Sequence, residues 1–180
     1  MKKIFVIIAS LLVIQSEAQF KQATLQASGL TCAMCSKAIY KSLEKLVFAE
    51  KIQSNIKESS FTITFKQNEA VDFDAIRKAV EDAGFAVANL KVTANFNDVS
   101  VANDSHVVVD GKSLHFLNVK SQVLKGDNVL QVIDKKFVSD KVYNKYAAAT
   151  KMQCFTSGVM ENTTGKQGQS TATRIYHVTI

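Results

Sequence analysis

Two cysteines, Cys32 and Cys35, lie close together in the segment 29–35, whose sequence is GLTCAMC. Two thiols at this spacing can bind one metal ion together or form a disulfide with each other. The residues that follow are predicted to be helical, so both sulfurs are expected near a helix N-terminus. The helix dipole and the free backbone N–H groups there favour the thiolate over the thiol. The thiolate is the form that both metal binding and thiol exchange need.

The number and type of the ligands favour Cu(I). Soft thiolates select Cu(I), Zn(II) or another soft ion such as Hg(II), and two ligands satisfy Cu(I) in a near-linear site, whereas Zn(II) takes four. Thr31 precedes the first cysteine, so no carboxylate there supplies a harder third ligand. Met34 is expected to point away from the metal. Cu(I) is therefore the expected metal, and Zn(II) and Hg(II) are the alternatives.

A Cys-x-x-Cys pair at a helix start is also the arrangement of thiol–disulfide oxidoreductases. The chain contains no proline, and so lacks the residue that thioredoxin-type sites place opposite their cysteines. Metal binding without catalysis is the preferred interpretation. A thiol–disulfide redox protein of the cell envelope is the alternative.

Residues 1–18 have the pattern of a secretory signal peptide. Lysines at positions 2 and 3 precede an apolar run over 4–14, and Ser16 and Ala18 are the small residues that a signal peptidase reads. The run is shorter than the roughly 20 residues of a membrane-spanning helix. We expect cleavage after Ala18 and an exported protein, periplasmic or secreted, that is not inserted in a membrane.

Hydrophobic periodicity over 20–92 predicts the order strand, helix, strand, strand, helix, strand. Alternation of apolar and polar residues predicts the first strand over 23–28. The second helix is predicted to begin after Asp72 as N-cap and to end at Gly84. This order is the βαββαβ pattern of a ferredoxin-like sandwich.

With its cysteine segment and the sequence EDAGF at 81–85, this region resembles the heavy-metal-associated domain of copper chaperones and copper-transporting P-type ATPases. The usual Gly-Met-Thr-Cys-x-x-Cys is altered only by Leu30, which is expected to pack beneath the loop. The resemblance implies that Cys32 and Cys35 are the metal ligands. It also implies that Phe85 shields the site, although a core aromatic is an equal interpretation. The implied function is delivery or sequestration of Cu(I).

Three lysines fall four residues apart on the helix after the cysteines, at Lys37, Lys41 and Lys45. Such a stripe is either a solvated face or a docking surface for an acidic partner, because long-range attraction speeds encounter and fades with salt. A metal-transporting ATPase or another envelope protein with an acidic face is the partner that this second interpretation suggests. The net charge of +6 is too diffuse to indicate nucleic-acid binding.

A β-rich second domain is predicted over 99–180, after a polar boundary near 93–98. We expect a hairpin over 107–119, a strand over 128–138, a helix over 139–149, and strands over 152–159 and 173–180. This order resembles an OB-type barrel. The chain is thus predicted to be α+β, with a ferredoxin-like sandwich followed by a small OB-like β-barrel. No basic strand face with interleaved aromatics is present, which argues against oligonucleotide binding.

The hairpin predicts a second candidate site. With Asp110 and Gly111 as the turn residues, His106 lies directly opposite His115, on the face away from the core. Two imidazoles that close can bind Cu(II) or Zn(II), although cross-strand histidine pairs are usually incidental. Cys154 and Met152 are predicted to share a strand face, where core packing and a second soft-metal site are the two interpretations.

Overall fold

The computed structural model describes residues 18–30, 32–162 and 171–180. Nearly all of the predicted signal peptide lies outside the described residues, so cleavage and export stay predictions. Within the described part of the chain, none of the helices has the length and apolar character needed to cross a membrane.

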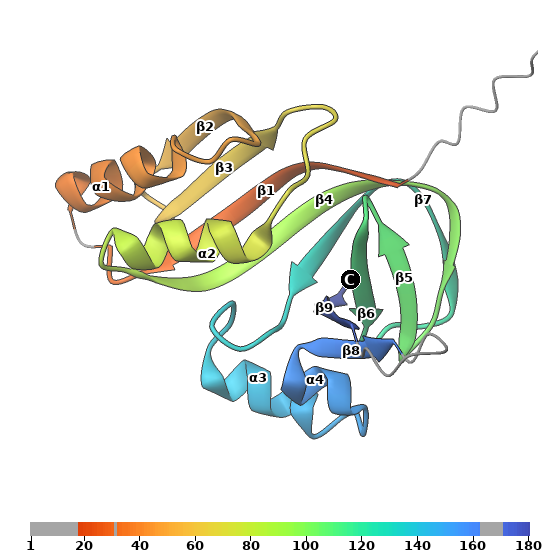
Figure 1. Ribbon diagram of the computed structural model, residues 1–180. Coiled ribbons are helices and arrows are strands. Elements are labelled where there is room, and N and C mark those ends of the chain that lie inside the picture. The colour runs from red at the N-terminus through yellow and green to blue at the C-terminus, as the bar shows by residue number, and fades with distance from the viewer. Residues whose placement is uncertain (1–17, 31, 163–170) are drawn as a thin grey trace, which may run out of the picture.

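The chain contains both strands and helices, with helices between strands in each half (Figure 1). The elements are β1 (Gln19–Ser28), α1 (Ala33–Leu43), β2 (Ala49–Asn55), β3 (Ser60–Phe65), α2 (Phe73–Asp82), β4 (Ala86–Val101), β5 (Ser105–Val109), β6 (Lys112–Phe116), β7 (Gln122–Val132), α3 (Asp140–Ala147), α4 (Gln153–Ser157), β8 (Val159–Asn162) and β9 (Thr171–Thr179). The mixture confirms the α+β class.

The first half is the predicted ferredoxin-like unit. Its strands lie in the order β2-β3-β1-β4, all neighbours antiparallel, and α1 and α2 pack against each other over them (Figure 1). Asp72 caps α2 as predicted, because its carboxylate accepts hydrogen bonds from the N–H groups of Asp74 and Ala75. Gly84 follows the helix with a φ of +87°, the left-handed conformation expected there.

One long strand joins the two halves of the chain. β4 pairs with β1 through its first part and with β7 from Leu90 to Val101, so it belongs to both halves. The polar stretch near 93–98, which the sequence suggests as a boundary, lies inside this strand. The complete sheet has the order β2-β3-β1-β4-β7-β9-β6-β5. The division into domains at 20–92 and 99–180 stays a prediction.

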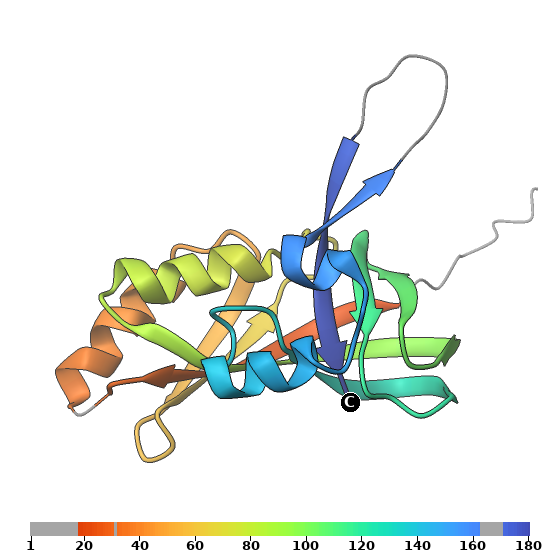
Figure 2. The ribbon, with the colours of Figure 1, turned by 90° about the horizontal axis from the view of Figure 1, so that it is seen from below.

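The predicted hairpin of the second half is confirmed, and its register places His106 opposite His115. Asp110 and Gly111 form the turn with φ values of +48° and +71°, as a two-residue turn requires. β9 pairs with β8 in its first part and then lies between β6 and β7 (Figure 2). The predicted OB-type barrel is not confirmed, because the described strands form an open path that ends at β5.

The strand predicted over 152–159 is wrong. Residues 153–157 form the short helix α4, and the strand β8 does not begin until Val159. Gly158 ends the helix with a φ of +70°. Phe155 packs into a small separate core with Leu117, Ile133 and Val138. Burial of this one aromatic side chain, whose neighbours in the sequence are polar, stabilises a helical turn. The strand predicted over 128–138 lies earlier, at Gln122–Val132, where it pairs with β4.

The C-terminal strand β9 is hydrogen-bonded to, and packs against, the start of α2. Arg174 donates a hydrogen bond to Asp74 over 2.9 Å, and the Tyr176 hydroxyl donates to the same carboxylate over 3.1 Å. Burial alone would raise the pKa of Asp74, but Arg174, the Tyr176 hydroxyl and the charge of Arg77 together outweigh it and the pKa is lowered. Phe73 packs against Tyr176. The two halves therefore share one continuous core.

Candidate metal sites

The first candidate site lies where the chain leaves β1 and enters α1. Gly29 turns the chain with a φ of +77°, and Cys32 is the N-cap of α1. The Cys32 sulfur accepts a hydrogen bond from the backbone N–H of Cys35 over 3.3 Å. The two sulfurs lie 2.6 Å apart, both as thiols, and Cys32 is exposed. The geometry thus brings both side chains to one point at the protein surface.

Hydrogen bonding lowers the pKa of the Cys32 thiol. The pKa of Cys32 is lowered mainly by the hydrogen bond from the Cys35 side chain, then by the Cys35 backbone N–H, while desolvation opposes the shift. These donors stabilise negative charge on the sulfur, as expected at a helix N-terminus. Cys32 is therefore prepared to act as a thiolate, either as a metal ligand or as a nucleophile in thiol exchange.

Apolar residues support this loop from below. Leu30 and Phe85 are both half-buried and pack against the main core, which confirms the predicted packing of Leu30 and shows that Phe85 is at least in part a core aromatic. Met34 is 75% exposed, so it lies on the surface next to the cysteines. Whether Phe85 also shields a bound ion stays a prediction.

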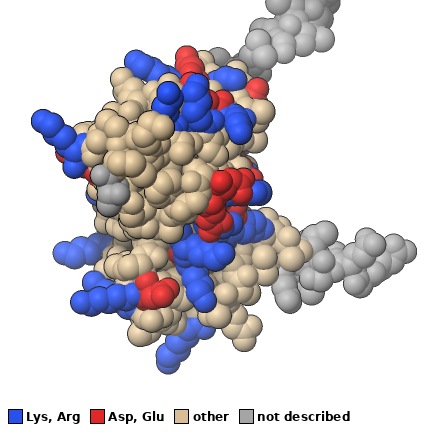
Figure 3. Space-filling model, turned by 90° about the vertical axis from the view of Figure 1, so that its left-hand side faces the viewer, with Lys and Arg blue, Asp and Glu red and all other residues tan. Residues whose placement is uncertain are grey.

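The predicted lysine stripe is exposed on this end of the molecule. Lys37, Lys41 and Lys45 are all exposed, and Lys41 pairs with Glu44 over 2.8 Å. Figure 3 shows lysine and arginine side chains around a broad uncharged area, with fewer acidic side chains among them. The face has the charge that attraction of an acidic partner requires.

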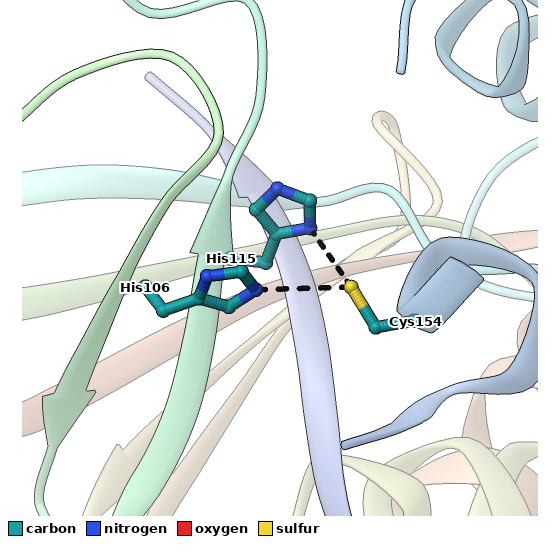
Figure 4. Close-up of side chains that lie close together, drawn as sticks. All are labelled: His106, His115 and Cys154. Carbon is teal, nitrogen blue, oxygen red and sulfur yellow. Dashed lines mark hydrogen bonds between the residues drawn. The ribbon is translucent and has the colours of Figure 1, made fainter. Parts of the chain in front are cut away.

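The second candidate site joins three residues from three elements. His106 on β5 and His115 on β6 stack with ring centroids 4.4 Å apart. Cys154 on α4 points its sulfur toward both, 3.7 Å from His106 Nε2 and 3.5 Å from His115 Nδ1 (Figure 4). The three ligand atoms lie within 4.8 Å of one another. The predicted histidine pair is confirmed, but its predicted position on the face away from the core is wrong for His115, which is fully buried. The sequence did not predict that Cys154 lies beside this pair, because it predicted a strand where α4 forms.

A carboxylate fixes the orientation of the buried histidine. His115 is fully buried, and its Nε2 lies 3.1 Å from Asp104 Oδ1. Thr150 donates a hydrogen bond to the same oxygen over 3.0 Å. When Nε2–H donates to Asp104, Nδ1 carries the lone pair that faces Cys154. Asp104 and Thr150 carry no signal in the sequence, because only the fold brings them to the histidine.

The surroundings keep the two imidazoles neutral. Burial, followed by the charges of His106 and His177, lowers the pKa of His115 to about 4, against the opposing effect of Asp104. Burial likewise lowers the pKa of His106 and raises the pKa of the Cys154 thiol. A thiolate–imidazolium pair, which a cysteine nucleophile would use, is therefore disfavoured. Neutral imidazoles are the form that binds metal ions.

A third histidine lies beside this site. His177 on β9 pairs with His115 in the sheet, with ring centroids 5.1 Å apart. It is fully buried, and its Nδ1 lies 2.7 Å from the carboxylate of Asp134. Its Nε2 is buried without a hydrogen-bond partner among the described residues. His177 packs edge-to-face on His115 and Phe155, and these contacts fix the buried side of the site.

The first half of the chain therefore has the fold and the exposed dithiol of a small metal-binding domain. Residues 24–86 match the family model described as "heavy-metal-associated domain". They form a heavy-metal-associated domain, homologous to a segment of copper-transporting ATPases. Such domains bind metal and are not catalytic in themselves.

Copper transporters are among the proteins that match this region. The probable copper-exporting P-type ATPase of Archaeoglobus fulgidus is 31% identical over 68 residues, and a copper-transporting ATPase of Helicobacter pylori is 38% identical over 58 residues. The matches cover 38% and 32% of this chain but only 8% of each relative. The solved yeast copper transporter domain CCC2A is 26% identical, with a TM-score of 0.33, over 36% of this chain and 88% of that one.

Proposed function

We propose that this protein is an exported Cu(I) carrier, which binds one ion between Cys32 and Cys35 and passes it to a partner. The observation that carries the proposal is that the Cys32 and Cys35 side chains meet at an exposed helix N-terminus. An exposed two-coordinate ion leaves room for an incoming ligand of the recipient. Transfer can then proceed by ligand exchange without release of the ion to water. The similarity to copper-transporting ATPases supports the choice of copper.

Titration of the reduced protein under anaerobic conditions tests this proposal. We expect the Cys154→Ser variant, in which the other candidate site is disabled, to bind one equivalent of Cu(I) in competition with a Cu(I) chelator. Zn(II) is expected to bind much more weakly, because two thiolates leave half of its coordination unfilled. A preference for Zn(II) or Hg(II) over Cu(I) at this site would contradict the choice of metal.

Thiol–disulfide exchange is the competing function, because a thiol of lowered pKa beside a second thiol also suits that chemistry. Insulin reduction by the metal-free protein separates the two. Efficient reduction together with Cu(I) binding no tighter than that of a simple dithiol would favour the redox function. Slow reduction and tight binding support the carrier.

The lysine stripe on α1 is expected to make the rate of Cu(I) transfer depend on salt concentration. Replacing Lys37 and Lys45 with glutamate reverses the charge beside the cysteine loop. We expect this change to slow Cu(I) transfer to an acidic partner on the order of tenfold at low salt, because charges at the edge of an interface act mainly on the association rate. The measurement is the transfer rate at several ionic strengths. Replacing Lys91 and Lys120, which are exposed lysines outside α1, is the matched control. Rates that stay flat with salt would remove the docking role.

Export is proposed from the sequence of residues 1–18 alone. N-terminal sequencing of protein purified from its native cells is expected to begin at Gln19, the first residue of β1. A chain that retains Met1 would contradict the proposal.

A further inference from the structure

We propose that His106, His115 and Cys154 form a second metal site, distinct from the dithiol and selective for a copper ion. The three residues come from β5, β6 and α4, which lie far apart in sequence, yet their ligand atoms converge on one point (Figure 4). The proposed ion would take two imidazole nitrogens and one sulfur. The proposal is independent of the function assigned to Cys32 and Cys35.

The spacing of the ligand atoms fits a bound ion. Metal bonds of about 2.0 Å to nitrogen and about 2.3 Å to sulfur, at tetrahedral or trigonal angles, place the nitrogen and sulfur roughly 3.5–3.7 Å apart. The observed separations from Cys154 Sγ are 3.5 Å to His115 Nδ1 and 3.7 Å to His106 Nε2. Both sulfur–nitrogen separations therefore match those of a bound ion, and all three ligand atoms lie within 4.8 Å of one another.

The cluster also has a carboxylate that orients one of its histidines, as metal sites usually do. Histidines that bind metals usually donate their other ring N–H to a carboxylate or carbonyl, which fixes the ring and raises its basicity. His115 has this arrangement with Asp104, and Thr150 donates a hydrogen bond to the same carboxylate oxygen. A merely incidental histidine pair has no need of such support. The arrangement therefore favours metal binding over chance stacking.

The side chains around the cluster favour copper over zinc. Met152 and Met160 line the same pocket as His106 and Cys154, so soft thioether sulfurs are available beside the three ligands. A His₂Cys set with a weak methionine ligand is typical of copper, whereas Zn(II) would need a water or carboxylate as its fourth ligand. Met152 is 40% exposed, and His106 is exposed as well. An ion thus has a path from solvent.

Titration in a variant without the dithiol tests the site. In the Cys32→Ser/Cys35→Ser chain we expect one equivalent of Cu(I) to bind anaerobically. Adding Cys154→Ser is expected to lower this affinity at least about a hundredfold, and Asp104→Asn to lower it about 10–100-fold through the orientation of His115. Co(II), used as a spectroscopic probe, is expected to give a sulfur-to-metal charge-transfer band that the Cys154→Ser change abolishes.

Gln153→Ala is the matched control, because Gln153 neighbours Cys154 and lines the same pocket without a ligand atom of this cluster. This variant should bind like its parent. His106→Ala, at an exposed position, removes a ligand with little risk to folding, and circular dichroism checks that each variant is folded. Absence of Cu(I) binding in the folded dithiol-free chain would overturn the site. Binding of Zn(II) but not Cu(I) would overturn the assignment to copper.

Alkylation of Cys154 gives an independent readout. Bound Cu(I) is expected to protect this thiol from iodoacetamide in the dithiol-free chain, as measured by mass spectrometry. Equal alkylation with and without the metal would show that the sulfur is not a ligand and would overturn the proposal.

Discussion

Replacing Cys32 with serine is expected to lower the Cu(I) affinity of the dithiol site on the order of 10²–10³-fold. Structural zinc sites with four ligands bind their ion by about 10–16 kcal/mol, so one ligand accounts for roughly 2.5–4 kcal/mol. Cys32 is also the helix N-cap whose sulfur accepts a hydrogen bond from the Cys35 N–H, and its pKa is lowered there. A serine hydroxyl keeps the cap but offers no soft ligand.

The measurement is chelator competition in a Cys154→Ser background, so that binding at the histidine cluster does not mask the loss. Met34→Ala is the matched control, because Met34 is exposed between the two cysteines and is expected to leave the affinity unchanged. Similar losses in both variants would show that the loop conformation, not the sulfur of Cys32, sets the affinity. An unchanged affinity in Cys32→Ser would place the Cu(I) elsewhere in the protein.

Local pattern was sufficient to predict the first half of the chain. Apolar periodicity, the Asp72 cap and the left-handed Gly84 each act over a few residues, so the elements between β1 and β4 followed from the sequence. The hairpin register followed from its two turn residues in the same way. These features identified Cys32, Cys35 and the histidine pair. That these residues bind metal stays a prediction.

Tertiary contacts decided the parts that the sequence did not predict. The polar residues near 93–98 form strand because β7 supplies hydrogen-bond partners for the second part of β4. The residues around Cys154 form a helical turn because Phe155 is buried on Leu117 and Val138. Only that packing turns the Cys154 sulfur toward the histidines. A third ligand supplied by a distant element leaves no local trace in the sequence.

The two candidate sites lie at different ends of the molecule. The cysteine loop precedes α1 at one end of the sheet, whereas the histidine cluster belongs to the hairpin at the other end (Figure 1). A single ion is therefore not shared between them. Two bound copper ions per chain are expected, and each dissociates independently of the other.

Replacing Phe73 with alanine is expected to destabilise the whole protein by about 3–5 kcal/mol, the usual cost of removing a buried phenylalanine. Phe73 is fully buried at the start of α2. Its ring centroid lies 5.0 Å from that of Phe20 on β1 and 4.8 Å from that of Tyr176 on β9. The cavity would therefore open between the first half of the chain and its last strand.

Thermal unfolding followed by circular dichroism measures this effect. We expect one cooperative transition that moves down by roughly 6–20 °C, since about 2–4 °C corresponds to each kcal/mol in a chain of this size. Phe85→Ala is the matched control, because Phe85 is half-buried at the edge of the same core and should cost less. Two separate transitions, with only one of them shifted, would instead show that the halves unfold as the two independent domains that the sequence predicts. The shared strand β4 and the bonds of Arg174 to Asp74 make the single transition the expected result.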